Sequence, residues 1–217
     1  MITRRTLVLG VAAASLGGFA AAALLARRQQ EQKSTPLSLP PGSSLVRDYS
    51  PVLGRKDTPV TVVEFFDPAC EACRAFHPIV KRILGTYPQQ VRVILRYATF
   101  HQGSDEVVSM LEAARLQDMF EAVLEAVLEA QPAWAAHDQP RLNIAWDAAA
   151  RAGLDVDRAR RERMLPGLVA RVNQDAADVA ALGIRQTPTF FINGKPLPSF
   201  GSEQLLEAVA SEVQALG

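Results

Sequence analysis

Asp67-Pro68-Ala69-Cys70-Glu71-Ala72-Cys73-Arg74 contains the only two cysteines of the 217-residue chain, spaced as one C-x-x-C pair. An apolar, β-branched run over 60–66 leads into this stretch, and apolar residues at three- and four-residue spacing follow it as far as 84. Pro68 breaks regular structure just ahead of the pair. The pattern predicts a strand, a sharp turn and a helix whose first turn carries two thiols.

The start of a helix is a favourable place for a reactive thiol. Unpaired backbone N–H groups and the helix dipole favour an anion there, so the pKa of Cys70 should fall below the ~8.5 of a free cysteine. Cys73 lies one turn later, faces the core and can attack a mixed disulfide formed at Cys70. Glu71 adds a negative charge beside Cys70, so we expect less activation than in the most acidic C-x-x-C sites, near pKa ~3.5.

Other roles for the pair remain open at this point. A structural disulfide would close a very small loop and add little stability, since the entropic benefit grows with loop length. The two thiols could also be unused. A metal site needs further ligands, and His77 supplies one by extending the motif to C-x2-C-x3-H. A copper or other metal-binding protein using Cys70, Cys73 and His77 is therefore the main alternative.

The composition is that of one globular domain with a sizeable core, because 48% of the residues are hydrophobic and 21% are charged. Lysine and arginine together number 23, as do aspartate and glutamate, so the formal net charge is zero. A nucleic-acid-binding protein usually carries a strong positive charge. We therefore expect no nucleic-acid partner.

Residues 1–26 are typical of an export signal. Arg4 and Arg5 give a charged start, an uncharged Ala/Gly/Leu-rich run follows, and small residues gather near 21–23. The paired arginines after Thr3 are similar to a twin-arginine signal. We expect this leader to be cleaved.

An uncleaved membrane anchor is the alternative for the leader. Residues 7–26 are long enough to span a bilayer, although Arg27 and Arg28 beyond them conflict with the positive-inside rule. Either outcome places the body of the protein outside the cytoplasm, in the periplasm or anchored to the inner membrane. There a C-x-x-C pair has access to oxidising partners.

A polar, Pro/Ser-rich linker is predicted over 27–44, and the folded domain over 45–217, beginning with a short edge strand within 45–53. The run over 60–66 suits a central strand covered on both faces, and Glu64 is its one acid. Burial would raise the pKa of that carboxyl. Glu64 is either a strand-end acid that reaches solvent or a buried acid that takes the proton of Cys73.

The helix that follows the cysteines is expected to end near Gly85, and 91–97 to form a second strand parallel to the first. The next loop, 99–103, contains His101, which we interpret as an ordinary loop residue. The last part of the chain is predicted to hold a Pro188-started strand over 189–192, a hairpin turn at Asn193-Gly194 and a final helix capped by Ser202.

Residues from about 104 to 183 are helical by pattern, which predicts an inserted helical subdomain. Pro132 is expected to stop the helix that runs over 120–130, and Asp155 to cap the helix over 155–164. Three large side chains of this block are interpreted as packing or surface residues, namely Trp134, His137 and Trp146.

The order of these elements resembles a thioredoxin fold with a helical insertion, as in the DsbA-like thiol–disulfide oxidoreductases. Three matches carry the resemblance: the C-x-x-C after the strand, Glu64 six residues before Cys70, and Thr187-Pro188 before the last apolar strand. The resemblance covers about 45–217. It implies an α/β, thioredoxin-like fold with the helical insertion at about 104–183.

The resemblance also implies roles for individual residues. Cys70 would be the nucleophile, Cys73 the resolving thiol, and Glu64 the group that handles the Cys73 proton. Pro188 is expected to be cis and, with Thr187, to present backbone that pairs with an extended substrate chain. The implied partners are cysteine-containing substrate proteins and a membrane redox partner that recharges the site, and no cofactor is implied.

The two residues between the cysteines depart from the family pattern. Strongly oxidising members carry Pro-His there and thioredoxin carries Gly-Pro, whereas this chain has Glu71-Ala72. Because an acid disfavours the thiolate, we expect a potential away from the oxidising extreme of about −120 mV. The direction of exchange, as oxidase, reductase or isomerase, stays open, and so does a membrane-tethered binding module with a vestigial site.

Overall fold

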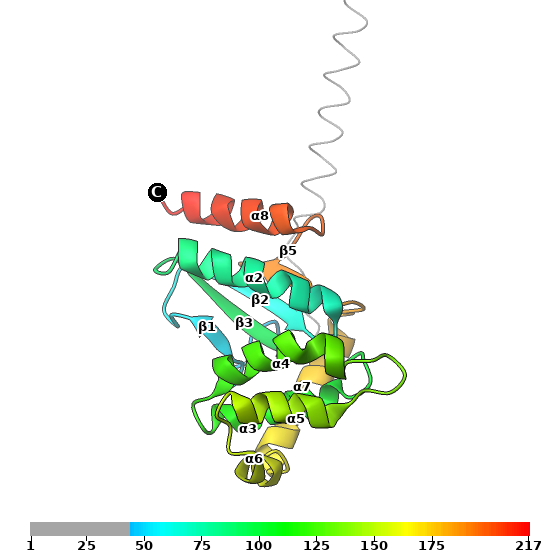
Figure 1. The fold of residues 1–217 in the computed structure, drawn as a ribbon. Coiled ribbons are helices and arrows are strands. Elements are labelled where there is room, and N and C mark those ends of the chain that lie inside the picture. Colours follow the sequence, from blue (N-terminus) through cyan, green and yellow to red (C-terminus); the bar gives the residue numbers. More distant parts are fainter. Residues whose placement is uncertain (1–43) are drawn as a thin grey trace, which may run out of the picture.

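The computed structural model describes residues 44–217, so the predicted leader and nearly all of the predicted linker lie outside the described residues. A five-stranded mixed sheet forms the centre of this part of the chain, in the order β1-β3-β2-β4-β5 (Figure 1). The strands are β1 (Val52–Gly54), β2 (Val60–Phe66), β3 (Val91–Tyr97), β4 (Thr189–Ile192) and β5 (Lys195–Pro196).

The register of the sheet decides where the site forms. β2 pairs in parallel with β3 and antiparallel with β4, so β2 is the central strand. Phe65 pairs with Thr189. The turn that follows β2 and the Thr187-Pro188 segment that precedes β4 therefore meet at one edge of the sheet, although they are about 120 residues apart.

Seven helices are described: α2 (Glu71–Thr86), α3 (Ser104–Arg115), α4 (Phe120–Trp134), α5 (Leu142–Arg151), α6 (Val156–Glu162), α7 (Pro166–Ala181) and α8 (Ser202–Gln214). Five of them, α3 to α7, lie between β3 and β4 in the chain, in the stretch where the sequence predicts a helical insertion. No helix within residues 44–217 is long and apolar enough to cross a membrane.

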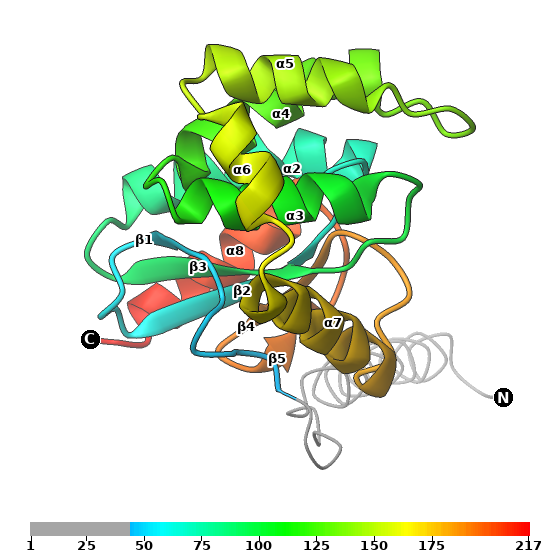
Figure 2. The same ribbon diagram turned by 90° about the horizontal axis from the view of Figure 1, so that it is seen from below.

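Alternate side chains of β2 enter two different cores, as the two-residue period of a strand requires. Val60, Val62 and Phe66 belong to a large core that also contains side chains of α2, α3, α4 and α8. Val63 and Phe65 belong to a smaller core with Val179 of α7. Figure 2 accordingly shows α7 on the opposite side of the sheet from α3.

Two of the predicted helix boundaries are wrong. Pro132 does not stop α4, which continues to Trp134. The indole of Trp134 is fully buried and donates a hydrogen bond to the Val127 carbonyl (2.9 Å), which holds the last turn despite the missing proline N–H. Ser202 does not cap α8, because Gly201 takes the N-cap position and Ser202 is the first helical residue.

Asp155 caps α6 as the sequence predicts, since its carboxylate accepts a hydrogen bond from the Arg158 N–H at 2.9 Å. The edge strand expected within 45–53 is β1, which covers Val52–Gly54, ends one residue beyond the expected range and is antiparallel to β3.

Candidate active site

The two cysteines lie where β2 turns into α2, as predicted. Cys70 is the N-cap residue of α2, and its backbone N–H donates to the Asp67 carbonyl at 3.1 Å. Cys73 is fully buried one turn later, and its Sγ accepts a hydrogen bond from the Asp67 N–H at 3.4 Å. Both cysteines are free thiols, and only Cys70 retains exposed surface, at 6%.

The environment separates the acidities of the two thiols. Hydrogen bonding from Cys73 lowers the pKa of Cys70 to about 5, against the opposing effect of burial and with further help from Thr187 and from the first N–H groups of the helix. Burial raises the pKa of Cys73, and the charges of Cys70 and Glu64 raise it further. Only Cys70 is therefore a thiolate at neutral pH.

The Thr187-Pro188 peptide bond is cis, which confirms the prediction for Pro188. It brings the Thr187 carbonyl to 3.2 Å from the Cys70 Sγ, which donates a hydrogen bond to it when protonated. Thr187 is half-buried and Pro188 is buried. The nucleophilic sulfur and the segment before β4 thus form one continuous surface.

Of the two environments considered for Glu64, the structure shows the buried one, because only 3% of the residue is exposed. By the alternation of β2 it points to the same side as Val62 and Phe66, beneath α2. Burial raises the pKa of Glu64 to about 8, with a smaller contribution from the charge of Cys70. Its charge in turn raises the pKa of Cys73, so the two groups lie close enough to interact.

Asp67 and His101 form a buried contact beside the cysteines that was not predicted. The Asp67 carboxylate has no exposed surface, and it accepts hydrogen bonds from Ala69 N–H (2.9 Å), Phe100 N–H (2.8 Å), His101 N–H (3.1 Å) and the Ser104 hydroxyl. The Nδ1 of His101 lies 2.8 Å from the same carboxylate. An acid directly after a buried strand was the signal that sequence reasoning overlooked.

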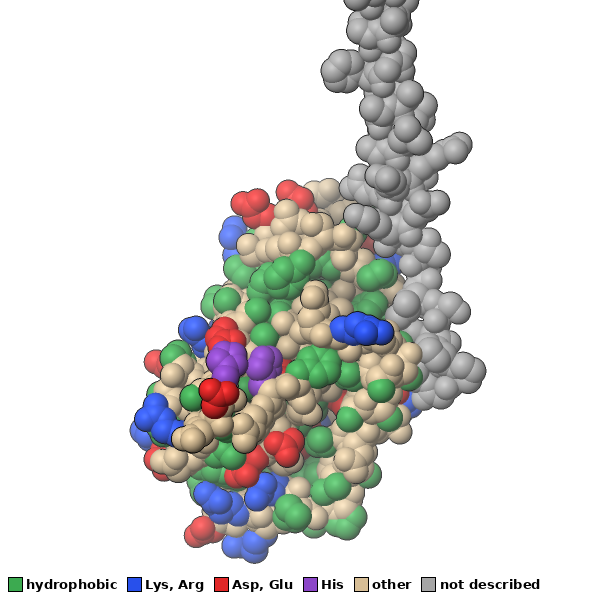
Figure 3. All heavy atoms as spheres, turned by 90° about the vertical axis from the view of Figure 1, so that its right-hand side faces the viewer, with side chains coloured by type: hydrophobic (Ala, Val, Ile, Leu, Met, Phe, Trp, Pro, Cys, Tyr) green, Lys and Arg blue, Asp and Glu red, His purple; other side chains and the backbone are tan. Residues whose placement is uncertain are grey.

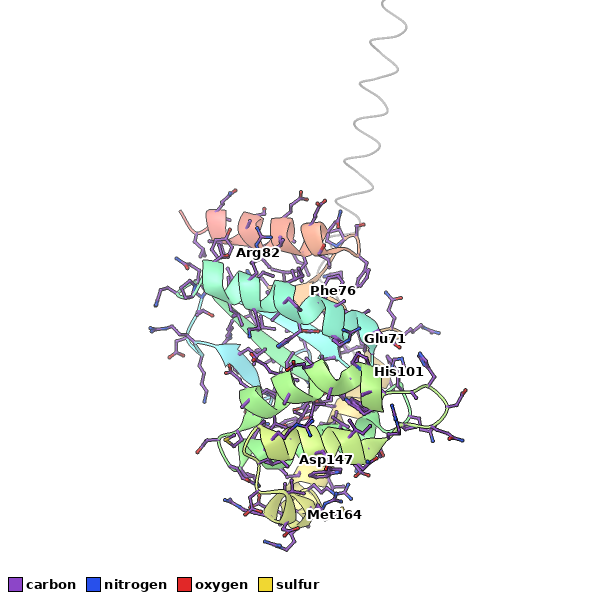
Figure 4. The ribbon with its side chains drawn as sticks, in the orientation of Figure 1. Glu71, Phe76, Arg82, His101, Asp147 and Met164 are labelled. Carbon is purple, nitrogen blue, oxygen red and sulfur yellow. The ribbon has the colours of Figure 1, made fainter. Side chains whose placement is uncertain are left out.

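A second histidine reaches the site from the loop after α4. His137 Nε2 lies 3.0 Å from Glu71 Oε1, and its ring centroid is 6.1 Å from that of His101. The interpretation of His137 as an ordinary surface residue is therefore incomplete, since it is exposed but contacts the residue between the cysteines. Figure 4 shows Glu71 and His101 at the same end of the molecule.

Gln131 of α4 ties the helical insertion to the active-site turn. Its buried amide donates to the carbonyls of Pro68 (2.8 Å) and Cys70 (2.9 Å), and its oxygen accepts from Arg74 Nε at 2.9 Å. This residue was also missed. Gln131 follows Leu128 by three residues and Leu124 by seven, which places it on the apolar face of its helix. A glutamine at such a position is the pattern that could have revealed it.

His77 does not join the cysteines in a metal site. The described residues contain no group of three or more histidine, cysteine, aspartate or glutamate side chains that could hold a metal ion. His77 instead lines a pocket with Lys81, Glu121 and Glu125, and its buried Nε2 has no hydrogen-bond partner. The geometry therefore gives no support to the metal-binding alternative.

Comparison with known proteins places the chain in a family. A family model described as Thioredoxin matches residues 47–210. A curated relative, the Na(+)/H(+) antiporter NhaA of Herminiimonas arsenicoxydans, is 30% identical over 146 residues, which are 67% of this chain and 22% of that protein. The chain spans about a quarter of the length of the curated relatives that it matches.

Solved structures agree with this placement. A thioredoxin-like oxidoreductase from Silicibacter pomeroyi is 27% identical, with a TM-score of 0.67 over 79% of this chain and 95% of that one. BdbD from Bacillus subtilis is 25% identical, with a TM-score of 0.67 over 76% and 93%. Wolbachia pipientis alpha-DsbA1 shares the fold at 17% identity, with a TM-score of 0.67 over 79% and 96%.

The expected α/β, thioredoxin-like fold is therefore confirmed, and so is the resemblance on which it rested. The chain belongs to the thioredoxin family, and its structure is similar to those of thiol–disulfide oxidoreductases of the DsbA type.

Proposed function

We propose that this enzyme exchanges disulfides with cysteines of other proteins outside the cytoplasm, through the C-E-A-C pair Cys70 and Cys73. One observation carries the proposal. The Sγ of Cys70, the more acidic thiol, lies 3.2 Å from the Thr187 carbonyl, and of the two cysteines Cys70 alone has exposed surface. A reactive thiolate beside an extended backbone segment suits attack on a disulfide of a polypeptide.

In the first step the Cys70 thiolate attacks one sulfur of a substrate disulfide. A bond forms between Cys70 Sγ and that sulfur, the substrate S–S bond breaks, and the second substrate sulfur leaves as a thiolate. The low pKa of Cys70, about 5, keeps this sulfur deprotonated at neutral pH. Thr187 and Pro188, beside it, contact the bound chain.

In the second step Cys73 attacks Cys70 and releases the substrate. Burial and two neighbouring negative charges disfavour the Cys73 thiolate, but the mixed disulfide removes the charge of Cys70. Loss of the Cys70 charge also lowers the pKa of Glu64, and the ionised form of Glu64 then accepts the Cys73 proton. The Cys70–Cys73 disulfide forms, so the protein is oxidised by two electrons and the substrate is reduced. The same steps in reverse oxidise a substrate dithiol.

The leader supports a location outside the cytoplasm, and the exchange chemistry supports the proposed partners. Arg4 and Arg5 before an uncharged run support export by a twin-arginine-like signal over 1–26, with retention as an inner-membrane anchor as the other outcome. Repeated turnover outside the cytoplasm requires a membrane redox partner that recharges the cysteine pair. The substrates are cysteine-containing proteins of that compartment.

Exchange assays on single-cysteine variants test the proposal. Cys70→Ser should abolish the acceleration of insulin-disulfide reduction by dithiothreitol, because the attacking thiolate is lost. Cys73→Ser should retain the first step and accumulate a mixed disulfide with the substrate, visible on a non-reducing gel. Full activity in Cys70→Ala would contradict the proposal and favour a binding module with a vestigial site.

A further inference from the structure

Two histidines stand at the rim of the cysteine pair, and the exchange steps above do not use them. Figure 3 shows two histidine side chains next to each other on one face of the molecule, with acidic side chains on either side. The ring centroids of His101 and His137 are 6.1 Å apart. They come from different elements, the loop before α3 and the loop after α4, so only the folded protein brings them together.

The position of His101 is set by Asp67. An ionised carboxylate only accepts hydrogen bonds, so the contact at 2.8 Å places a proton on His101 Nδ1. A second proton can then be taken up only at Nε2. The side chain is 30% exposed, which allows that proton to exchange with solvent.

Charges near His101 favour its protonated form. Partial burial alone would lower the pKa of His101, but the hydrogen bond to Asp67 and the charges of Asp67, Cys70 and Glu71 outweigh burial and raise that pKa. The effect of Cys70 is reciprocal, because a thiolate that favours a proton on His101 is itself favoured by that proton. His101 is thus coupled to the nucleophile without a direct hydrogen bond to it.

Other charged groups around Cys70 do not supply this positive charge. Glu64, beneath the site on β2, has a pKa of about 8 and is largely neutral at pH 7. Glu71 is negative and pairs with His137 at 3.0 Å. Arg74 of α2 is held by Gln131, and Arg185 is exposed in the loop before Thr187. His101 is therefore the group on this rim whose positive charge is coupled to Cys70.

We propose that His101 and His137 form a rim that stabilises the Cys70 thiolate and offsets Glu71, so that protonation of His101 makes the disulfide more oxidising. This inference rests on the proposed exchange function of the cysteines. His101, positioned by Asp67, acts on Cys70 through its charge, and His137 acts by neutralising Glu71. Both are positioning residues for the reaction.

The rim also couples reduction to an additional proton. Two glutathione thiols supply two electrons and two protons when they reduce the Cys70–Cys73 disulfide. One proton goes to Cys73, and because Cys70 stays a thiolate the other is available to His101 Nε2. Forming the disulfide reverses the transfer, since it removes the negative charge that raised the pKa of His101. Without His101 the reaction would release one proton, and uptake of that proton at Nε2 reduces the release, so the equilibrium constant with glutathione should depend less steeply on pH while His101 titrates.

Titration of the reduced protein tests the proposal directly. The rate of alkylation by iodoacetamide from pH 3 to 8 reports the Cys70 thiolate. We expect His101→Gln, which keeps an N–H for Asp67, to lower the acid constant of Cys70 about fivefold. His137→Gln should shift it in the same direction by less, and His101→Lys, which keeps a positive charge, should restore the wild-type value. His77→Gln removes the third histidine and should change nothing.

The equilibrium with glutathione gives a second readout that a purely structural role would not change. Between pH 5 and 8 the equilibrium constant of the wild type should vary less steeply with pH than that of His101→Gln, because His101 takes up part of the proton that reduction releases. Identical Cys70 titrations in wild type, His101→Gln and His137→Gln would overturn the proposal, and so would parallel pH profiles. The exposed His137 variant keeps the test valid if His101→Gln fails to fold. Loss of exchange in Cys70→Ser tests the proposed function separately.

Discussion

Cys70 and Cys73 are three residues apart, yet the fold drives their acidities in opposite directions. Cys70 is at the N-cap of α2, where N–H groups and the Cys73 thiol stabilise its charge. Cys73 is fully buried above Glu64, where a second negative charge would be unfavourable. Exchange needs this asymmetry, because one sulfur must attack first and the other must wait for the mixed disulfide.

The hydrogen bond between the thiols leads to the first prediction. Cys73→Ala removes the largest contribution that lowers the pKa of Cys70, so that pKa should rise from about 5 towards the ordinary value. The pH dependence of Cys70 alkylation in the reduced variant measures the change. A Cys70 pKa that stays at about 5 in Cys73→Ala would show that the helix N-terminus alone sets the acidity.

Glu64 should make stability depend on pH. Its pKa rises from 4.5 in the unfolded chain to about 8 in the fold, so the folded state binds more protons between these values and stability falls as the pH rises through that window. Glu64→Gln removes this penalty. We expect the variant to gain up to about 5 kcal/mol relative to wild type at pH 9 and little at pH 4.

Urea unfolding of the reduced proteins at the two pH values checks this prediction. Glu203→Gln, an exposed acid at the start of α8, is the matched control and should change stability equally at both. A pH-independent difference between Glu64→Gln and wild type would contradict a raised Glu64 pKa. The same variant should slow release of the mixed disulfide, because Cys73 loses its proton acceptor.

Sequence reasoning identified candidate site residues that carry a local or family pattern and missed those that reach the site through long-range contacts. Cys70, Cys73, Glu64 and Pro188 stand at recognisable places next to a strand. His137 contacts Glu71 only because α4 packs beside α2, and a single sequence carries no sign of that packing. The same holds for Asp67 and His101, whose bond spans 34 residues.

At the scale of elements, α4 supports the active-site turn through Gln131. Its amide satisfies two carbonyls of the turn, and replacing it by leucine leaves these buried acceptors without donors. Gln131→Leu should cost about 1–3 kcal/mol of stability and weaken the control of Cys70 geometry. The measurements are urea unfolding and the Cys70 alkylation profile, with exposed Gln139→Leu as the control. Wild-type stability in Gln131→Leu would show that solvent replaces the amide.

A buried ionic cluster holds α7 against the sheet. Arg96 of β3 has no exposed surface, and its guanidinium donates to Asp175 (2.9 Å) and Asp178 (2.6 Å) of α7. Asp178 also accepts from Arg47, of the segment before β1, at 2.7 Å. The cluster therefore joins three parts of the chain on the face of the sheet opposite α2.

Removing one acid of this cluster should be costly. Asp175→Ala leaves the charge of Arg96 buried with fewer partners and should destabilise the protein by about 3–5 kcal/mol in urea unfolding. Asp157→Ala, on the exposed side of α6, should stay within about 0.5 kcal/mol of wild type. An equal, small effect of both variants would mean that solvent reaches Arg96 after the change.

For the whole molecule, chain order and the family resemblance were enough to predict the fold class. The two strands on either side of the C-x-x-C helix pair in parallel, as predicted, whereas the order of all five strands came only from the structure. The sequence could not predict the packing of α3 to α7, because helices of similar composition, such as α4 and α5, have no local feature that identifies the helices they pack against. The two wrong boundaries, at Pro132 and Ser202, arose where a side-chain hydrogen bond within the helix or a glycine outweighed a local rule.

The reduction potential of the cysteine pair tests the central claim most directly. Wild-type protein equilibrated with glutathione at several ratios should form one intramolecular disulfide between Cys70 and Cys73, as a single two-electron couple. The account predicts a potential between about −270 and about −120 mV, the range that thioredoxin and DsbA span. Failure to form the intramolecular disulfide at any glutathione ratio would contradict exchange through this pair.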